Sequence, residues 1–309
     1  MRRNVKKFYP AFGSVSGLAL LGGLLSGCAN PAPRETEYVP HAGKATVLSS
    51  VAVWANIAQT IGGPEVIASA IIAGPNRDPH SYEASVRDQL AVNQADITIA
   101  NGADYDTFFS KLVNHRPAIN SITSPDLAHQ LRLASANPHF WYSLSITARA
   151  AQIISNAERI AMPTQDRAIQ IQNRTDAFLA ALTSLREREA SIGAAHAGQT
   201  ALLTEPFAAY MLTDLGIRDL TPAAFRNAVE QEQDASPAVM LQMHNQLRNH
   251  KISVLIVNQQ TVSNQTAQLV GWARSARVPV LSWSELLPAK TSYLQWMIHN
   301  LTQIEGVLK

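Results

Sequence analysis

The sequence predicts an α/β protein of two lobes, each a mainly parallel sheet flanked by helices, with one long helix between them. Strand-like runs of β-branched residues alternate with amphipathic stretches, which is the pattern of parallel α/β sheets. Residues 166–192 contain neither Gly nor Pro and show helical periodicity. A chain of 309 residues, 46% of them hydrophobic, is also long enough to form two domain-sized units with a globular core.

The first lobe is expected over residues 45–163. An apolar run at 45–51 is followed by an amphipathic stretch that stops at Gly62 and Gly63, and this strand-then-helix order repeats. The expected strands are 45–51, 66–73, 96–100, 118–123 and 131–135, and the expected helices are 53–61, 85–94 and 104–114.

The connecting helix is expected over residues 164–192. A helix of roughly 27 residues is about 40 Å long, which is the span of a whole lobe. Thr164 is a candidate N-cap, and Gly193 follows the predicted end. Two shorter helices of a bundle remain the alternative.

The second lobe is expected over residues 193–309. Its expected strands are 200–204, 252–257 and 278–281. Helices are expected from 237 to 249, from about 262 to 277 and near the carboxyl end of the chain. In parallel sheets, ligands bind outside the carboxyl ends of the strands. Polar side chains just after these strands are therefore candidates for a binding site.

The amino end has the features of a lipoprotein signal peptide over residues 1–27. Arg2 and Arg3 begin a basic segment, and the apolar run 13–25 is too short to span a bilayer comfortably. It ends in Leu-Ser-Gly-Cys, which resembles the bacterial lipobox, so Cys28 is the predicted lipidation site. A buried core cysteine is the alternative.

Residues 28–44 are rich in Pro and polar residues, and they predict a flexible tether without a core-forming face. Because Cys28 is the only cysteine, no other thiol is present to ligate a metal. The formal net charge of +2, with no concentrated basic face, argues against a nucleic-acid partner.

Two Pro-His steps mark the first lobe. Pro79 and Pro138 each stiffen the backbone before a histidine, so His80 and His139 are presented at rigid turns. Two such imidazoles suggest two ligands of one metal ion. The alternative for each is a loop histidine that is hydrogen-bonded to the backbone.

Two glutamates follow strands of the second lobe. Glu205 comes directly after the strand at 200–204 and before a proline, and Glu285 lies beyond the strand at 278–281. For Glu205 the alternative is a carboxylate that stabilises a helix amino end. Two imidazoles and two carboxylates suit Zn²⁺ or Mn²⁺, and the absence of thiolates excludes Cu(I) handling.

Three segments together resemble the zinc/manganese (cluster A-I) solute-binding proteins of bacterial ABC importers. They are Asp-Pro-His-Ser-Tyr-Glu at 78–83, Asn-Gly-Ala-Asp-Tyr at 101–105 and Asn-Pro-His-Phe-Trp at 137–141. The usual Asp before the second Pro-His is Asn137 here. In this family a single long helix joins two nearly rigid lobes, and Glu is a variant at the position of Glu205.

The resemblance implies a lipid-anchored, extracytoplasmic receptor that binds Zn²⁺ or Mn²⁺ between its lobes and delivers it to an ABC permease of the cytoplasmic membrane. We expect a monomer that uses no catalytic cofactor. The metal ligands would be His80, His139, Glu205 and Glu285. A receptor for a larger metal chelate or a corrinoid is an alternative. A secreted metallohydrolase is another, although the His-Glu-x-x-His motif is absent.

Overall fold

The computed structural model describes residues 43–74, 77–79, 81–114, 126–133 and 137–308. Several predictions fall outside these ranges. They are the signal peptide, Cys28, all of the tether but its last two residues, His80 and the strand expected at 118–123.

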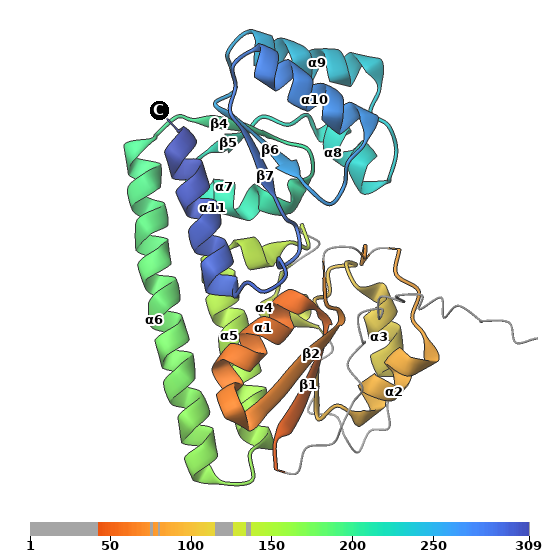
Figure 1. Ribbon diagram of the computed structural model, residues 1–309, viewed down its shortest axis with the longest axis vertical. Coiled ribbons are helices and arrows are strands. Elements are labelled where there is room, and N and C mark those ends of the chain that lie inside the picture. Colours follow the sequence, from red (N-terminus) through yellow and green to blue (C-terminus); the bar gives the residue numbers. More distant parts are fainter. Residues whose placement is uncertain (1–42, 75–76, 80, 115–125, 134–136, 309) are drawn as a thin grey trace, which may run out of the picture. The chain divides into compact units, whose positions relative to one another are not determined.

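The first sheet is parallel and has the strand order β2-β1-β3 (Figure 1). Its strands are β1 (Ala45–Val51), β2 (Val66–Ile72) and β3 (Ile97–Ile99). The helices that follow are α1 (Ala52–Gly62), the short 3-10 helix η1 (Gly63–Glu65), α2 (Val86–Gln94) and α3 (Thr107–Asn114). All three strands were predicted to within two residues, since their β-branched side chains pack well on a pleated, buried surface.

The strand predicted at 131–135 is wrong over its described residues, 131–133. Leu131 is the last residue of α4 (Leu127–Leu131), and Arg132 follows it in the left-handed conformation with φ of 56°. Asp126 caps this helix by accepting a hydrogen bond from the backbone N–H of His129. The next described elements are the 3-10 helix η3 (Phe140–Tyr142) and α5 (Leu144–Ala161).

The connecting helix α6 is continuous over 31 residues, Gln165–Ala195. It begins after Thr164, as predicted, although the Thr164 side chain makes no capping hydrogen bond. Gly193 lies inside the helix rather than after its end. A Cβ at this position would be 2.7 Å from the carbonyl oxygen of Leu215, so the glycine permits close packing of the backbone of the segment after α7.

The second sheet is also parallel, with the order β5-β4-β6-β7. Its strands are β4 (Thr200–Leu203), β5 (Arg218–Asp219), β6 (Val254–Asn258) and β7 (Val280–Trp283). The helices are η4 (Pro206–Ala208), α7 (Ala209–Asp214), α8 (Ala223–Glu230), α9 (Pro237–Arg248), α10 (Asn264–Ser275) and α11 (Tyr293–Val307).

One hydrophobic core runs through both lobes. It includes side chains of β1, α5, α6, β4 and α11, and the aromatic residues of η3 lie completely buried within it. A second core fills the space beneath α8, α9 and α10. Helix α11 contacts both α6 and α1, and therefore reaches from the second lobe to the first (Figure 1). The domain boundaries at 163 and 193 stay predictions.

The strand order of the second sheet has a topological switch point between β4 and β6, because β5 lies on one side of β4 and β6 lies on the other. Such switch points leave a crevice at the carboxyl ends of the strands. Glu205 follows β4 and Asn258 ends β6, so both lie at this point. Among the described helices, none is both long and apolar enough to cross a membrane.

Candidate metal site

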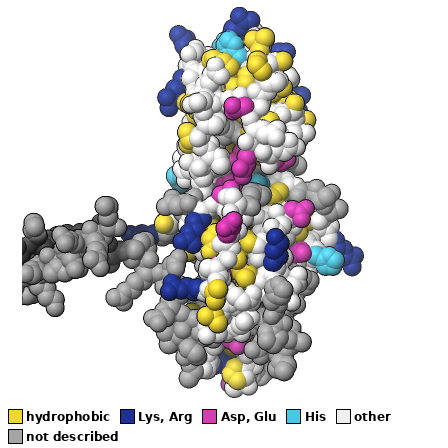
Figure 2. All heavy atoms as spheres, turned by 90° about the vertical axis from the view of Figure 1, so that its right-hand side faces the viewer, with side chains coloured by type: hydrophobic (Ala, Val, Ile, Leu, Met, Phe, Trp, Pro, Cys, Tyr) yellow, Lys and Arg dark blue, Asp and Glu magenta, His cyan; other side chains and the backbone are white. Residues whose placement is uncertain are grey.

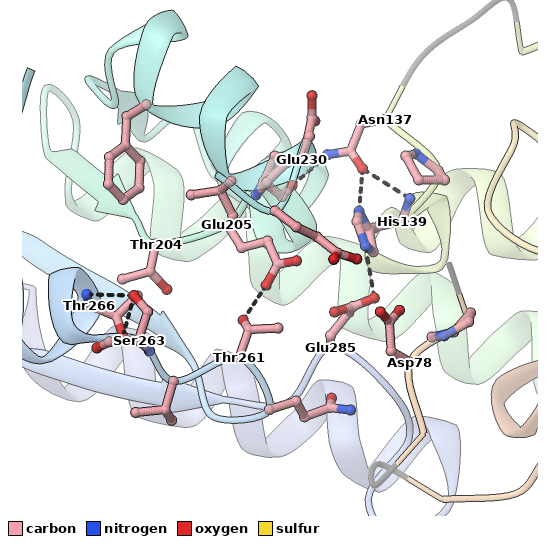
Figure 3. A pocket seen from close by; sticks show the side chains of 18 of the residues that line it. Asp78, Asn137, His139, Thr204, Glu205, Glu230, Thr261, Ser263, Thr266 and Glu285 are labelled. Carbon is pink, nitrogen blue, oxygen red and sulfur yellow. Dashed lines mark hydrogen bonds and ion pairs between the residues drawn. The ribbon is translucent and has the colours of Figure 1, made fainter. Parts of the chain in front are cut away.

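A cavity of about 1210 Å³ is lined by residues of both lobes. Its first-lobe wall comes from the turn before residue 80 and from the loop that carries His139. Its second-lobe wall comes from the carboxyl ends of β4 and β7 and the loop after β6 (Figure 3). We refer to this space as the inter-lobe cavity.

Acidic side chains are concentrated around the inter-lobe cavity. Besides Glu205 and Glu285, the acidic lining residues are Asp78, Asp104, Glu230, Glu232 and Asp234. Figure 2 shows Asp and Glu side chains gathered midway along this face. Arg77 is the only Lys or Arg among the described lining residues. The cavity therefore attracts cations rather than anions.

His139 occupies the N-cap position of η3 and is 3% exposed. Asn137 Oδ1 accepts the backbone N–H of His139 at 3.0 Å and lies 2.6 Å from its ring Nδ1. The Asn137 amide is held in this orientation because its Nδ2 donates to the Pro206 carbonyl. Nδ1 of His139 therefore carries a hydrogen, and Nε2 is the ring nitrogen that faces the cavity.

Glu285 lies two residues beyond β7 and is 6% exposed. Its Oε1 is 3.0 Å from His139 Nε2 and accepts the Tyr105 hydroxyl at 2.5 Å. Its Oε2 accepts Asn258 Nδ2 at 3.0 Å. The backbone is fixed as well, because Trp141 Nε1 donates to the Glu285 carbonyl at 3.1 Å. The carboxylate is thus held by side chains of both lobes.

The surroundings keep Glu285 ionised. Burial alone would raise the pKa of Glu285, but the charge of His139 and the hydrogen bonds from His139, Tyr105 and Asn258 outweigh it and lower the pKa to about 2. Burial, followed by the charge of Glu285, raises the pKa of Tyr105 well above its ordinary value. Tyr105 consequently stays a neutral hydroxyl that donates to the carboxylate.

Glu205 lies two residues beyond β4 and precedes Pro206, the first residue of η4. Its Oε2 accepts the Thr261 hydroxyl at 2.6 Å and also accepts Asn258 Nδ2. Burial and then the charge of Glu285 raise the pKa of Glu205, while the two hydrogen bonds oppose this rise. Two carboxylates held this close to each other favour a cation between or beside them.

Of the four predicted ligands, the structure brings His139 and Glu285 into direct contact and connects Glu205 to Glu285 through Asn258. His80 lies outside the described residues, although its neighbours Asp78 and Pro79 line the cavity. Within the described ranges, no three His, Cys, Asp or Glu side chains are close enough together to form a metal site by themselves.

The sequence reasoning did not identify Asn258, Tyr105 or Thr261 as site residues. Asn258 ends a buried strand, so the rule that selected Glu205 and Glu285 could have selected it too. Tyr105 falls within the helix expected at 104–114, and its hydroxyl contact joins residues that are 180 positions apart in the sequence. No local signal in the sequence reveals a contact of that kind.

The sequence profile of the family "Zinc-uptake complex component A periplasmic" (ZnuA) matches residues 47–307. The chain belongs to the ZnuA family. The resemblance seen in the three sequence segments is thereby confirmed. The ZnuA family is one of periplasmic metal-binding receptors, so the predicted receptor class and extracytoplasmic location are confirmed at that level.

The relatives compared with this chain are distant from it in sequence. The iron-binding protein YfeA of Yersinia pestis is 25% identical over 239 residues, which cover 74% of this chain and 73% of YfeA. The periplasmic zinc-binding protein TroA of Treponema pallidum superposes with a TM-score of 0.68 at 18% identity, covering 86% of this chain and 99% of TroA. The laminin-binding protein Lmb of Streptococcus agalactiae gives a TM-score of 0.71 at 17% identity, with coverage of 86% and 100%. These structural likenesses show the two-lobed fold.

Proposed function

We propose that this receptor captures one divalent transition-metal ion, Zn²⁺ or Mn²⁺, in the inter-lobe cavity, with His80, His139, Glu205 and Glu285 as ligands. The observation that carries the proposal is the contact between His139 Nε2 and Glu285 Oε1 at 3.0 Å. Zinc bonds to nitrogen and oxygen of about 2.0–2.2 Å in tetrahedral geometry separate two ligand atoms by about 3.4 Å. An ion therefore requires the two atoms to move apart by only a few tenths of an ångström.

The charges of the site also suit a dication. Glu205 and Glu285 supply two negative charges, which neutralise a divalent ion beside the buried side chains of His139 and Glu285. The Asn137 carbonyl oxygen holds the His139 ring so that Nε2 faces Glu285, which is the role of an outer-shell partner in known metal sites. The donor set contains nitrogen and oxygen only, as Zn²⁺ and Mn²⁺ accept.

We infer that the receptor works at the outer face of the cytoplasmic membrane, held there by a lipid on Cys28 and by the tether at 28–44. It passes its ion to an ABC permease. The predicted signal peptide at 1–27 and membership of the ZnuA family support this assignment. We expect the receptor to act as a monomer.

One observation favours the alternative ligand, a metal chelate. The inter-lobe cavity of about 1210 Å³ is far larger than a bare ion and exceeds many small-molecule pockets. The metal of such a chelate would bind to His139 and Glu285, and its organic part would lie against the loop after β6.

Titration calorimetry of the metal-stripped mature chain with Zn²⁺ and Mn²⁺ tests the proposal. We expect about one ion per chain, and a loss of affinity of about 100-fold or more for His139→Ala and for Glu285→Ala, because each removes a ligand. His244→Ala is the matched control, since this ring packs on Trp272 away from the cavity. Binding that requires an added chelator would support the alternative ligand, and unchanged affinity in Glu285→Ala would remove that residue from the site.

A further inference from the structure

Tyr105 and His139 both approach the same oxygen of Glu285. The Tyr105 hydroxyl donates to Glu285 Oε1 at 2.5 Å, and His139 Nε2 lies 3.0 Å from that oxygen (Figure 3 shows the contact with His139). A carboxylate oxygen carries two lone pairs, so it can serve two partners at once. An ion between His139 and Glu285 would use the lone pair that faces His139 and would leave the lone pair that accepts Tyr105.

Tyr105 is held firmly in the first lobe. Its side chain is 0% exposed, and its ring packs against the rings of His139 and Trp141, with centroid distances of 5.3 Å and 5.2 Å. Its backbone N–H donates to the Gly102 carbonyl at 3.2 Å. Asp106 stabilises the same turn by accepting the backbone N–H of Gly102 at 2.9 Å. The hydroxyl is therefore presented to the cavity in a fixed position.

Glu285 reaches this hydroxyl from the second lobe, where it follows β7. Its other oxygen, Oε2, accepts Asn258 Nδ2 at 3.0 Å. Tyr105 and Asn258 thus hold one carboxylate oxygen each, and the two donors come from different lobes. The carboxylate cannot rotate without breaking a buried, charge-assisted hydrogen bond, so Oε1 stays directed at His139.

We propose that Tyr105 is a positioning residue, which holds Glu285 in its ion-binding orientation across the boundary between the lobes. The proposal rests on the ligand role of Glu285 proposed above. Outer-shell donors orient a ligand before the ion arrives, and the ion then binds without the cost of ordering that ligand. Without the Tyr105 hydroxyl, the carboxylate would adopt further orientations, and binding would be weaker by the fraction of chains in which Oε1 is misdirected.

The test is the Zn²⁺ dissociation constant of the mature chain, measured by competition with a chelating dye. Tyr105→Phe removes the hydroxyl alone and keeps the ring that packs on His139 and Trp141. We expect the affinity to fall by about tenfold, as for the loss of other outer-shell partners. Unchanged affinity would overturn the proposal. Tighter binding would overturn it too, because the hydroxyl would then compete with the ion for Oε1.

Tyr142→Phe is the matched control. Tyr142 is also 0% exposed, and its hydroxyl also donates to the second lobe at 2.5 Å, but the acceptor is the backbone carbonyl of Ser284. The control therefore loses a similar buried hydrogen bond next to Glu285 without releasing the carboxylate. We expect it to leave the dissociation constant unchanged. An equal loss of affinity in Tyr142→Phe would mean that contact with the carboxylate is not what matters, and would overturn the proposal.

A double-mutant cycle shows whether Tyr105 acts through Glu285. In the Glu285→Ala background, Tyr105→Phe has no carboxylate to release and should cause no further loss of affinity. A full loss in that background would overturn the proposal, because Tyr105 would then act by another route.

Tyr105→Met is the second variant, used if Tyr105→Phe does not fold, because methionine fills the space of the ring flexibly and does not donate a hydrogen bond. The same loss of affinity is expected. If Glu285→Ala alone leaves the affinity unchanged, the ligand set of the proposed function fails and the role of Tyr105 fails with it. If Glu285→Ala weakens binding and neither Tyr105 variant does, only the role of Tyr105 is lost.

Discussion

Glu285 contacts groups that come from both lobes: its carboxylate lies 3.0 Å from His139 Nε2 and accepts hydrogen bonds from Tyr105 and Asn258. The strand-end rule applied to the sequence selected Glu285 and Glu205, and the structure places both on the inter-lobe cavity. His139 does not follow the strand expected at 131–135, because residues 131–133 form the end of α4 and the turn after it. The proline that stiffens its turn was the better predictor.

Glu158 of α5 is a buried acid that the site does not use. It is 0% exposed, and neither carboxyl oxygen has a hydrogen-bond partner among the described residues. Burial raises the pKa of Glu158 to about 9, although Arg174 opposes the rise. At neutral pH the side chain is therefore a neutral carboxylic acid within the core.

Because the folded protein keeps a proton on Glu158, its free energy of unfolding depends on pH. In the unfolded chain Glu158 ionises near its ordinary pKa of 4.5, whereas the folded protein keeps the proton up to about pH 9. Between these values the folded state holds one more proton, so the free energy of unfolding falls as pH rises, by at most about 1.4 kcal/mol per pH unit.

Glu158→Gln should remove this dependence. Urea unfolding of the metal-free chain should show the variant to be more stable than the wild type at pH 8, and the difference should disappear as the pH approaches 4.5. Glu187→Gln makes the same change of charge at an exposed position of α6 and is the control. Parallel pH profiles for wild type and Glu158→Gln would contradict the prediction.

At the scale of elements, the long helix was predictable but its end was not. The absence of Gly and Pro over 166–192 predicts a continuous helix, and α6 is one. Gly193 looked like a C-terminal glycine, yet it is a contact point for the Leu215 carbonyl. Only the tertiary structure distinguishes a glycine that ends a helix from one that admits a neighbouring backbone.

Gly193→Ala should destabilise the protein, although alanine favours helix by about 1 kcal/mol. The added Cβ would lie 2.7 Å from the Leu215 carbonyl oxygen, and such overpacking costs about 1–3 kcal/mol. Gly271→Ala in α10 is the matched control, because nothing lies within 4 Å of its Cβ. We expect opposite signs for the two changes in urea midpoint; a stabilised Gly193→Ala would show that the contact is easily relieved.

Other elements were missed or misplaced because their signals are short. The alternation of Leu131 and Leu133 with polar residues fits a strand, but Leu131 belongs to the five-residue helix α4. Strand β5 has only two residues, which is too short for any period to appear. The longer strands β1, β4 and β6 were predicted because short continuous runs of β-branched or aliphatic residues are typical of strands buried in parallel sheets.

For the molecule as a whole, the sequence predicted two α/β lobes and a linking helix but not the shared core. That core depends on contacts of η3 with residues far along the chain. For example, the Tyr142 hydroxyl donates to the Ser284 carbonyl at 2.5 Å, and the Tyr293 hydroxyl donates to the Trp141 carbonyl at 2.6 Å. No periodicity within either lobe encodes such contacts.

The shared core predicts that the two lobes unfold together. We expect urea transitions followed by far-ultraviolet circular dichroism and by Trp fluorescence to coincide. The signal of Trp272, which packs on the separate core of the second lobe, can be isolated by comparison with Trp272→Phe. A Trp272 transition at a lower urea concentration would show that this second core unfolds independently.

The residues that meet at Glu285 are widely spaced in the sequence, since His139 and Glu285 are 146 positions apart and Tyr105 and Glu285 are 180 positions apart. A nascent or unfolded chain therefore does not hold the proposed ligands together, because a preformed site rarely exists before folding. A receptor of this design cannot acquire its ion while it is still being translocated. The metal that it carries is chosen from the compartment in which the chain folds, and not from the one in which it is made.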